Sequence, residues 1–93
     1  MAILGTFVKQ PADRLDYDVD YTDWLTVGDS IESTVVSVSP ATLTIDSTFN
    51  NTPRIKIWLS GGVDKVRYKV TLTSTTADGR VKQDEFLVVV KDT

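Results

Sequence analysis

Apolar and polar residues alternate one for one over several short stretches of this chain, and this period limits the folds open to it. The clearest stretch is Leu15 to Tyr21, where leucine, tyrosine and valine fill the odd positions and aspartate fills the even ones. Successive side chains of a β-strand point to opposite faces, so this stretch predicts a strand with one buried and one acidic, solvated face. No run of ten or more residues has helical periodicity. The sequence therefore predicts an all-β fold.

Five further segments have strand character and are separated by turn residues. The six predicted strands cover residues 14–21, 30–39, 43–49, 54–60, 65–74 and 81–91. The apolar parity changes within the second, which predicts a β-bulge near 33–35. In the third, Leu43, Ile45 and Phe49 are expected to face inward. The last is apolar on both faces, which indicates a central strand or one covered by a neighbour.

The alternation breaks after Tyr21, and the next residues are expected to form a short irregular connection. Asp23 can cap a helical turn that holds Trp24 and Leu25. Gly28-Asp29 then reverses the chain toward the next strand. We expect Trp24 to close one end of the fold as a buried aromatic side chain.

Six or seven short strands with turn signals every eight to twelve residues predict an immunoglobulin-like β-sandwich of antiparallel strands. A small barrel is the alternative. The 93 residues suffice for one domain. We divide it into an N-terminal arm, residues 1–12, and the sandwich, residues 13–93. Pro11 cannot donate to a sheet, so the arm is expected to be a loose terminus, an edge strand or a tail that docks on a partner.

The composition excludes several kinds of chemistry. The chain has no cysteine and no histidine, which removes disulfides, thiolates, the commonest general base and the commonest metal ligand. No apolar run approaches the roughly 20 residues of a membrane span. The first residues lack the basic and long apolar regions of a signal peptide. We expect a protein made and used, or assembled, in a reducing cytoplasm, with no membrane partner.

The net charge of −3 is unevenly distributed and argues against nucleic-acid binding. Up to Thr48 there are eight acidic and two basic residues, and beyond it there are five acidic and eight basic. Acidic and basic strands that pair across the sheets would explain this asymmetry. Head-to-tail contact between copies, or with an oppositely charged neighbour, is the alternative.

A row of carboxylates, Asp16, Asp18 and Asp20 with Asp23 and Asp29 beyond, is the most tempting candidate site. A calcium loop needs a glycine at its sixth position, and neither frame of this row supplies one. Hydrolysis by paired carboxylates needs a cleft that a sandwich of this size has little room for. We interpret the row as a solvated strand face. No metal and no cofactor are expected.

Two tryptophans are candidates for a ligand platform or for contact with a partner. Trp58 shares a face with Lys56 and Ser60, opposite the stripe of Ile55, Ile57 and Leu59. We expect Trp58 to lie on the outer side of its strand, at the margin of the second layer or against a neighbour.

The basic residues Arg54, Lys56, Lys65, Arg67 and Lys69 are interleaved with Trp58 and Tyr68, as on a surface for single-stranded nucleic acid. Tyr68 has the parity of the apolar residues, so the charges and the aromatic ring are expected on opposite faces. Gly61-Gly62 has neither the lysine nor the helix of a phosphate-binding loop. Asn50-Asn51-Thr52-Pro53 is interpreted as a turn.

An ordered set of short motifs resembles a known family. The first part reads Phe7-Val8-Lys9-Gln10-Pro11-Ala12, Leu15-Asp16-Tyr17, Val19-Asp20-Tyr21, Trp24-Leu25 and Gly28-Asp29 with Ile31. The second part reads Ile57-Trp58-Leu59-Ser60-Gly61-Gly62, Tyr68 with Val70-Thr71, Thr75-Thr76, Gly79-Arg80, and Phe86 with Val88. Over nearly its whole length the chain resembles the small virion proteins of tailed bacteriophages described as phage fiber-tail adaptor proteins.

The resemblance implies an immunoglobulin-like structural protein of the virion, assembled in the bacterial cytoplasm, that is not an enzyme. Its partners would be other phage structural proteins at the connector, tail or fibre, with several copies in a symmetric assembly. We expect the arm and the sheet edges to make these contacts, and single out Phe7, Val8 and Trp58. A capsid decoration protein and a carbohydrate-binding module on the virion surface are the alternatives.

Overall fold

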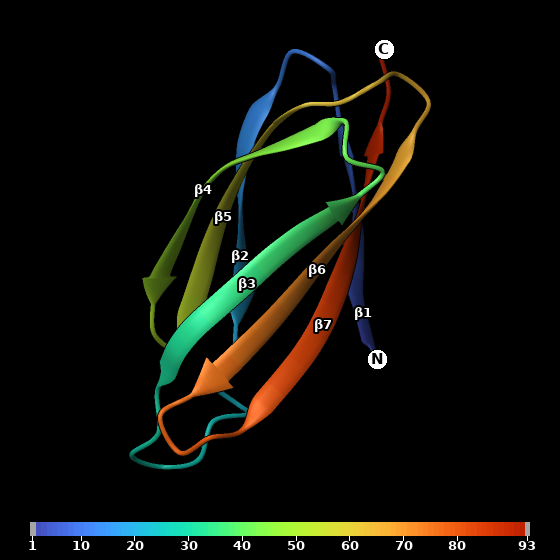
Figure 1. The fold of residues 1–93 in the computed structure, drawn as a ribbon. Coiled ribbons are helices and arrows are strands. Elements are labelled where there is room, and N and C mark those ends of the chain that lie inside the picture. Colours follow the sequence, from blue (N-terminus) through green and yellow to red (C-terminus); the bar gives the residue numbers. More distant parts are fainter. Residues whose placement is uncertain (1, 93) are drawn as a thin grey trace.

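A computed structural model describes residues 2–92, which form seven β-strands in two sheets (Figure 1). The strands are β1 (Ala2–Lys9), β2 (Arg14–Asp20), β3 (Ile31–Ser39), β4 (Leu43–Asn51), β5 (Arg54–Gly61), β6 (Arg67–Thr76) and β7 (Val81–Val90). The six strands predicted from alternation are all present, with ends within two residues of the expected positions. Across residues 2–92 there is no helix long and apolar enough to span a membrane.

The strands form a four-stranded sheet, β1-β7-β6-β3, and a three-stranded sheet, β2-β5-β4. The all-β prediction is confirmed, and the two layers are arranged as in a sandwich. The prediction that every strand is antiparallel is wrong for one pair, because β1 runs parallel to β7. The tight turn between β1 and β2, with Asp13 N donating to Gln10 O at 3.0 Å, passes the chain from one sheet to the other. As a result β1 and β2 do not form a hairpin, and β1 pairs with the far end of the chain.

For residues 2–9 the structure shows an edge strand, one of the three states that the sequence left open for the arm. Phe7 lies opposite Val88, and Lys9 opposite Val90. Beyond the strand ends, Lys91 N donates a hydrogen bond to Lys9 O at 2.8 Å. β7 therefore has a neighbour on each side, which confirms the prediction of a central or covered last strand.

The core lies between the two sheets and has the predicted parity over β5, β6 and β7. Ile55, Ile57 and Leu59 of β5 are fully buried. They pack in one cluster with the inward residues of the other sheet, Tyr68, Val70, Leu72, Phe86, Val88 and Val90. Burial of these alternating residues is the main favourable contribution to the stability of the fold.

Two irregularities change the faces of the outer strands. The bulge predicted in β3 is present, but at Glu32, one residue before the predicted range. A second register shift, at Asp46 of β4, was not predicted. It places one extra residue between Ile45 and Ser47, so Phe49 lies opposite Lys56 on the outer face and is 55% exposed. The prediction that Phe49 faces inward is therefore wrong.

The connection after β2 contains the predicted single helical turn with Trp24 and Leu25. Leu25 N donates to Tyr21 O at 2.9 Å, which closes a single turn. Asp20 caps this turn instead of Asp23, because its Oδ1 accepts hydrogen bonds from the amide and the hydroxyl of Thr22. Trp24 lies at this end of the sandwich, half-buried, with its ring centroid 5.9 Å from that of Tyr21. Gly28 has φ of 84° in the following turn, as the predicted chain reversal requires.

Candidate partner-binding surface

Each sheet has two edge strands, and each edge strand of one sheet lies near an edge strand of the other, β3 near β4 and β1 near β2. The β3–β4 side is closed by hydrogen bonds. At the β3–β4 side, Asn50 Nδ2 donates to Ile31 O at 2.7 Å, and Ile31 N donates to Thr52 Oγ1 at 3.0 Å. Both strands also carry a bulge on this side. These features leave few regular backbone groups for another chain to pair with.

The opposite side, where β1 and β2 approach each other, is held by an aromatic cluster of Phe7, Tyr17 and Phe86. The ring centroids of Phe7 and Tyr17 are 5.2 Å apart, and those of Phe7 and Phe86 are 5.8 Å apart. Phe7 therefore contacts both sheets. We call this the β1–β2 side. Among the side chains that the structure describes on this side, the partly exposed apolar ones are Phe7 (43% exposed), Val8 (64%) and Leu15 (39%).

Two adjoining hollows form a groove along β2, which we call the β2 groove. The first, of 290 Å³, is lined by Phe7, Asp16, Tyr17, Asp18, Val19 and Phe86. The second, of 340 Å³, shares Asp18 and Val19 with it and continues to Asp20, Tyr21, Asp23, Trp24, Lys82 and Asp84. The groove combines an apolar floor with several carboxylates.

The three residues predicted to contact a partner do not form one site. Phe7 points into the sandwich, and Val8, the next residue along the strand, points to the outer face of β1. Trp58 lies half-buried on the outer face of the three-stranded sheet, as its parity predicted. The guanidinium of Arg14 lies 4.4 Å from the centre of the Trp58 ring, so one face of this indole is covered.

The acidic row of β2 lies beside basic residues of the same sheet, as the charge distribution predicted. Lys56 Nζ is 3.4 Å from Asp16 Oδ2, and Arg54 Nε is 3.5 Å from Asp20 Oδ2. Asp18, between them, has no ion-pair partner among the described residues. Within residues 2–92 no group of acidic side chains is arranged to hold a metal ion.

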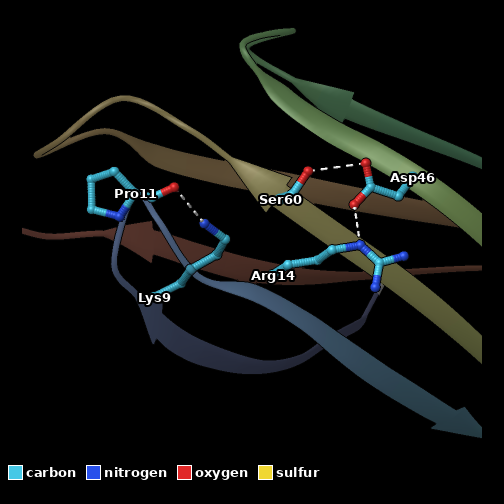
Figure 2. A network of polar contacts seen from close by, with 5 residues as sticks. All are labelled: Lys9, Pro11, Arg14, Asp46 and Ser60. Carbon is cyan, nitrogen blue, oxygen red and sulfur yellow. Dashed lines mark hydrogen bonds and ion pairs between the residues drawn. The ribbon is translucent and has the colours of Figure 1, made fainter.

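A third ion pair extends this arrangement to β4. Arg14 Nε donates to Asp46 Oδ2 at 3.0 Å, and Ser60 Oγ donates to Asp46 Oδ1 at 3.0 Å (Figure 2). Asp46 is the bulged residue of β4 and so bonds to side chains from both β2 and β5. These exposed pairs each contribute little stability, about 0–1 kcal/mol, but they fix which charges remain free on this face.

Sequence reasoning missed three buried charged residues, Lys9, Asp84 and Glu85, and Glu85 Oε2 lies 3.6 Å from Lys69 Nζ. The first is Lys9. It is 1% exposed, and its ammonium donates to Gln10 O at 2.7 Å and to Gly61 O at 2.5 Å. Pro11 O accepts a longer bond from it at 3.5 Å (Figure 2). Burial lowers the pKa of Lys9, although Asp13 and Tyr68 act in the opposite direction. Lys9 is two residues after Phe7 and so has the same parity in the strand. This parity was the sequence signal that could have predicted its burial.

The second is Asp84 of β7, which is 2% exposed and lines the β2 groove. Lys82 Nζ lies 3.3 Å from its Oδ1, yet that oxygen accepts no hydrogen bond of acceptable geometry from the described residues. The Tyr17 hydroxyl, on the same groove, is also buried and unpaired. Unpaired buried polar atoms are rare and call for an explanation.

Asp29, at the end of the predicted acidic row, has a structural role. Asp29 Oδ1 accepts from the amides of Ser30, at 2.9 Å, and Asp78, at 3.1 Å, which joins two turns. Burial alone would raise the pKa of Asp29. Hydrogen bonds from Thr76 and from these two amides together have a larger effect, so the pKa of Asp29 lies below its ordinary value. Arg80 lies 4.1 Å from the ring centre of Trp24.

The basic residues of β6 do not join an aromatic surface, whereas Arg54 and Lys56 of β5 share the outer face with Trp58. Arg67 and Lys69 are exposed on the outer face of β6, and Tyr68 is fully buried. This separation is what their parity predicted, and it leaves no stacking surface beside these charges.

Comparison with known families identifies the chain. Residues 9–89 match the model of the family described as podophage GP4 fiber-tail adaptor protein gp77. The chain belongs to this family. No curated protein sequence matches it. The fiber-tail adaptor is thus a structural, non-enzymatic component of the phage virion at the tail, and the sequence resemblance to this family is confirmed. The edges and outer faces described above are accordingly candidate surfaces for binding structural proteins.

Proposed function

We propose that this fiber-tail adaptor binds its neighbours in the virion through the β1–β2 side, with Phe7 and Val8, and through the outer face that carries Trp58. The observation that supports this best is the group of exposed apolar residues on the β1–β2 side beside the regular edge of β2. β3 and β4 also expose Val35 and Phe49, but their backbone edges are interrupted by bulges and joined at one end by hydrogen bonds. Exposed apolar side chains at an open sheet edge favour contact with another protein.

A symmetric assembly of several copies is part of the same proposal. The charges of the chain support it, because Arg67 is exposed on the four-stranded sheet and Asp18 is exposed on the other. Lys69, beside Arg67, is already paired with Glu85 at 3.6 Å. Opposite charges on separate faces favour heterologous contact between neighbouring copies.

We also propose the immunoglobulin topology for this sandwich. The order β2-β5-β4 corresponds to strands B, E and D of that fold, and β3-β6-β7 corresponds to strands C, F and G. The first strand departs from the constant-type order, because β1 lies beside β7 and not beside β2. In this scheme residues 1–12 are the contact segment and residues 13–93 form the supporting sandwich.

Point substitutions test the contact surface better than deletion of the arm. Removing residues 1–10 would also remove β1, the Phe7 contacts and the buried Lys9, so loss of binding would have two explanations. Val8→Glu changes a side chain that is 64% exposed. Val27→Glu is the matched control, because Val27 is fully exposed in the turn between β2 and β3 and belongs to neither proposed surface.

Particles are assembled in a host that lacks the wild-type gene and supplies either variant, and the adaptor and fibres per particle are quantified. We expect Val8→Glu to lower both and Val27→Glu to leave them unchanged, because a buried carboxylate at an interface is unfavourable. Normal incorporation of a folded Val8→Glu protein would contradict the proposed role of the β1 edge. Trp58→Ala tests the second surface in the same way.

A further inference from the structure

We propose that β2 and the groove beside it accept an extended segment of a partner protein in which lysine or arginine alternates with apolar residues. The segment would add to the three-stranded sheet as a fourth strand, next to β2. This inference rests on the proposed adaptor function and specifies the chemistry of one partner.

Among the four edge strands formed by residues 2–92, β2 is the only one whose pairing is regular throughout. It pairs with β5 without a register shift, from Arg14 opposite Ser60 to Asp20 opposite Arg54. The other three edges are each interrupted, between Ile3 and Thr6 in β1, Ile31 and Ser33 in β3, and Ile45 and Ser47 in β4. Bulges protect sheet edges against pairing, and β2 lacks this protection.

The register also shows which backbone groups of β2 are available. Tyr21 N donates to Pro53 O at 2.9 Å, so this is a hydrogen-bonded pair of the antiparallel ladder. Such pairs alternate with non-bonded pairs. The odd residues of β2 therefore bond to β5, and the N–H and C=O groups of Asp16, Asp18 and Asp20 point away from the sheet.

The β2 groove fits the inward side chains of an added strand. Its floor is apolar and aromatic, with Tyr17, Val19 and Phe86. Asp84 is 2% exposed and lines the groove, and its Oδ1, which lies 3.3 Å from Lys82 Nζ, accepts no hydrogen bond among the described residues. The Tyr17 hydroxyl is unpaired as well. An occupant with apolar side chains and a hydrogen-bond donor would fill the groove and satisfy these atoms.

The outer side of the same edge selects the charge of the occupant. Outward side chains of an added strand would lie directly beside Asp16, Asp18 and Asp20. Asp18 has no ion-pair partner among residues 2–92, so a lysine or arginine beside it gains a favourable contact. The β2 strand of a second copy is excluded, because two rows of three aspartates would then face each other.

The experiment uses the full chain and a fluorescent peptide of sequence Lys-Val-Lys-Phe-Lys-Val-Lys with blocked ends. Binding is measured by anisotropy, and amide hydrogen exchange is followed by NMR with and without the peptide. We expect saturable binding below about 1 mM, as for a weak edge contact. We also expect slower exchange at Asp16, Asp18 and Asp20, with no change at Tyr17 and Val19, whose amides already bond to β5.

Two altered peptides separate the backbone from the charges. N-methylation of alternate residues removes the N–H groups along one edge of the peptide. When that edge is the one that would pair with β2, binding should be abolished. The same peptide with glutamate for lysine should bind at least about tenfold more weakly, because like charges would then be adjacent.

On the protein, Asp18→Asn should weaken the lysine peptide by about two- to fivefold, which is the effect of one exposed ion pair. Glu32→Gln, an equal change of charge on the opposite side of the sandwich, should leave the affinity unchanged. Equal effects of the two variants would show that only net charge matters and would overturn the proposal.

Absence of binding at about 1 mM, or binding without protection of the even-numbered amides, would also overturn it. These results would leave the adaptor function intact if particles still incorporate the protein. Loss of incorporation on Asp18→Asn with normal incorporation of Val8→Glu would instead contradict the β1 contact and support the β2 groove.

Discussion

Three tyrosines of this small sandwich are buried or partly buried, and their hydroxyls differ in what they bond to. Tyr68 OH bonds to Thr42 Oγ1 at 2.6 Å and accepts from Val63 N at 2.8 Å. Tyr21 OH accepts from Ser74 Oγ at 3.2 Å. Tyr17 OH has no partner among the described residues. Burial accordingly raises the pKa of Tyr17, and Asp13 and Asp16 add to this effect.

At this scale we predict that Tyr17→Phe stabilises the isolated adaptor by about 1 kcal/mol, because the variant no longer buries an unpaired hydroxyl. Tyr68→Phe is the matched control and should destabilise it by about 1–2 kcal/mol, since it removes a hydroxyl with two bonds. Urea unfolding followed by circular dichroism measures both. Destabilisation by both variants to the same extent would show that Tyr17 OH is satisfied in solution.

At the scale of elements, the turn after β5 depends on a close approach that only glycine permits. Gly62 has φ of 98°, and a Cβ placed on it would lie 2.7 Å from Val90 Cγ2 and 3.3 Å from Leu43 Cδ1. Gly28, in the turn after Trp24, has a similar φ of 84° but no heavy atom within 4 Å of such a Cβ. The two glycines therefore separate backbone strain from packing.

We expect Gly28→Ala to lower the free energy of unfolding by about 1 kcal/mol, the cost of a positive φ at alanine. Gly62→Ala should cost about 1–3 kcal/mol more, because it also overpacks the end of the core. Thermal and urea unfolding of the two variants give the comparison. Equal losses would mean that Val90 and Leu43 move away without cost.

At the scale of the molecule, the two sheets share a single core and are joined at several points. Phe7 contacts Tyr17 and Phe86, and Lys9 Nζ bonds to Gly61 O, so β1 is connected to both layers. Ser74 Oγ donates to Tyr21 OH between the same two sheets. These connections predict that the sandwich unfolds as one unit.

The two tryptophans can test this prediction because they report on different places. Trp58→Phe leaves Trp24 at one end of the sandwich, and Trp24→Phe leaves Trp58 on the outer face of β5. In each variant the fluorescence and circular dichroism transitions should coincide, as expected for two-state unfolding. A fluorescence change of Trp24 that precedes the loss of strand structure would reveal separate unfolding of the turn after β2.

The candidate surface was only partly predictable at each of these scales. The parity of Trp58 and the exposure of the β2 aspartates followed from alternation, which is a local property of a strand. The separation of Phe7 from Val8 also follows from that period once β1 is known to be a strand. Lys9 and Asp84 were missed because the burial of a charge depends on groups that lie far away in sequence, such as Gly61 O.

By itself the sequence determined six strands, the inward face of most of them and the absence of thiol and imidazole chemistry, since each follows from composition or from a period of two. The tertiary structure alone decided that β1 joins β7 in parallel, that the bulge at Asp46 turns Phe49 outward, and that β2 remains an open, regular edge. The reason is that pairing between strands distant in the chain is set by which edges and side chains meet in space. No local pattern contains that information.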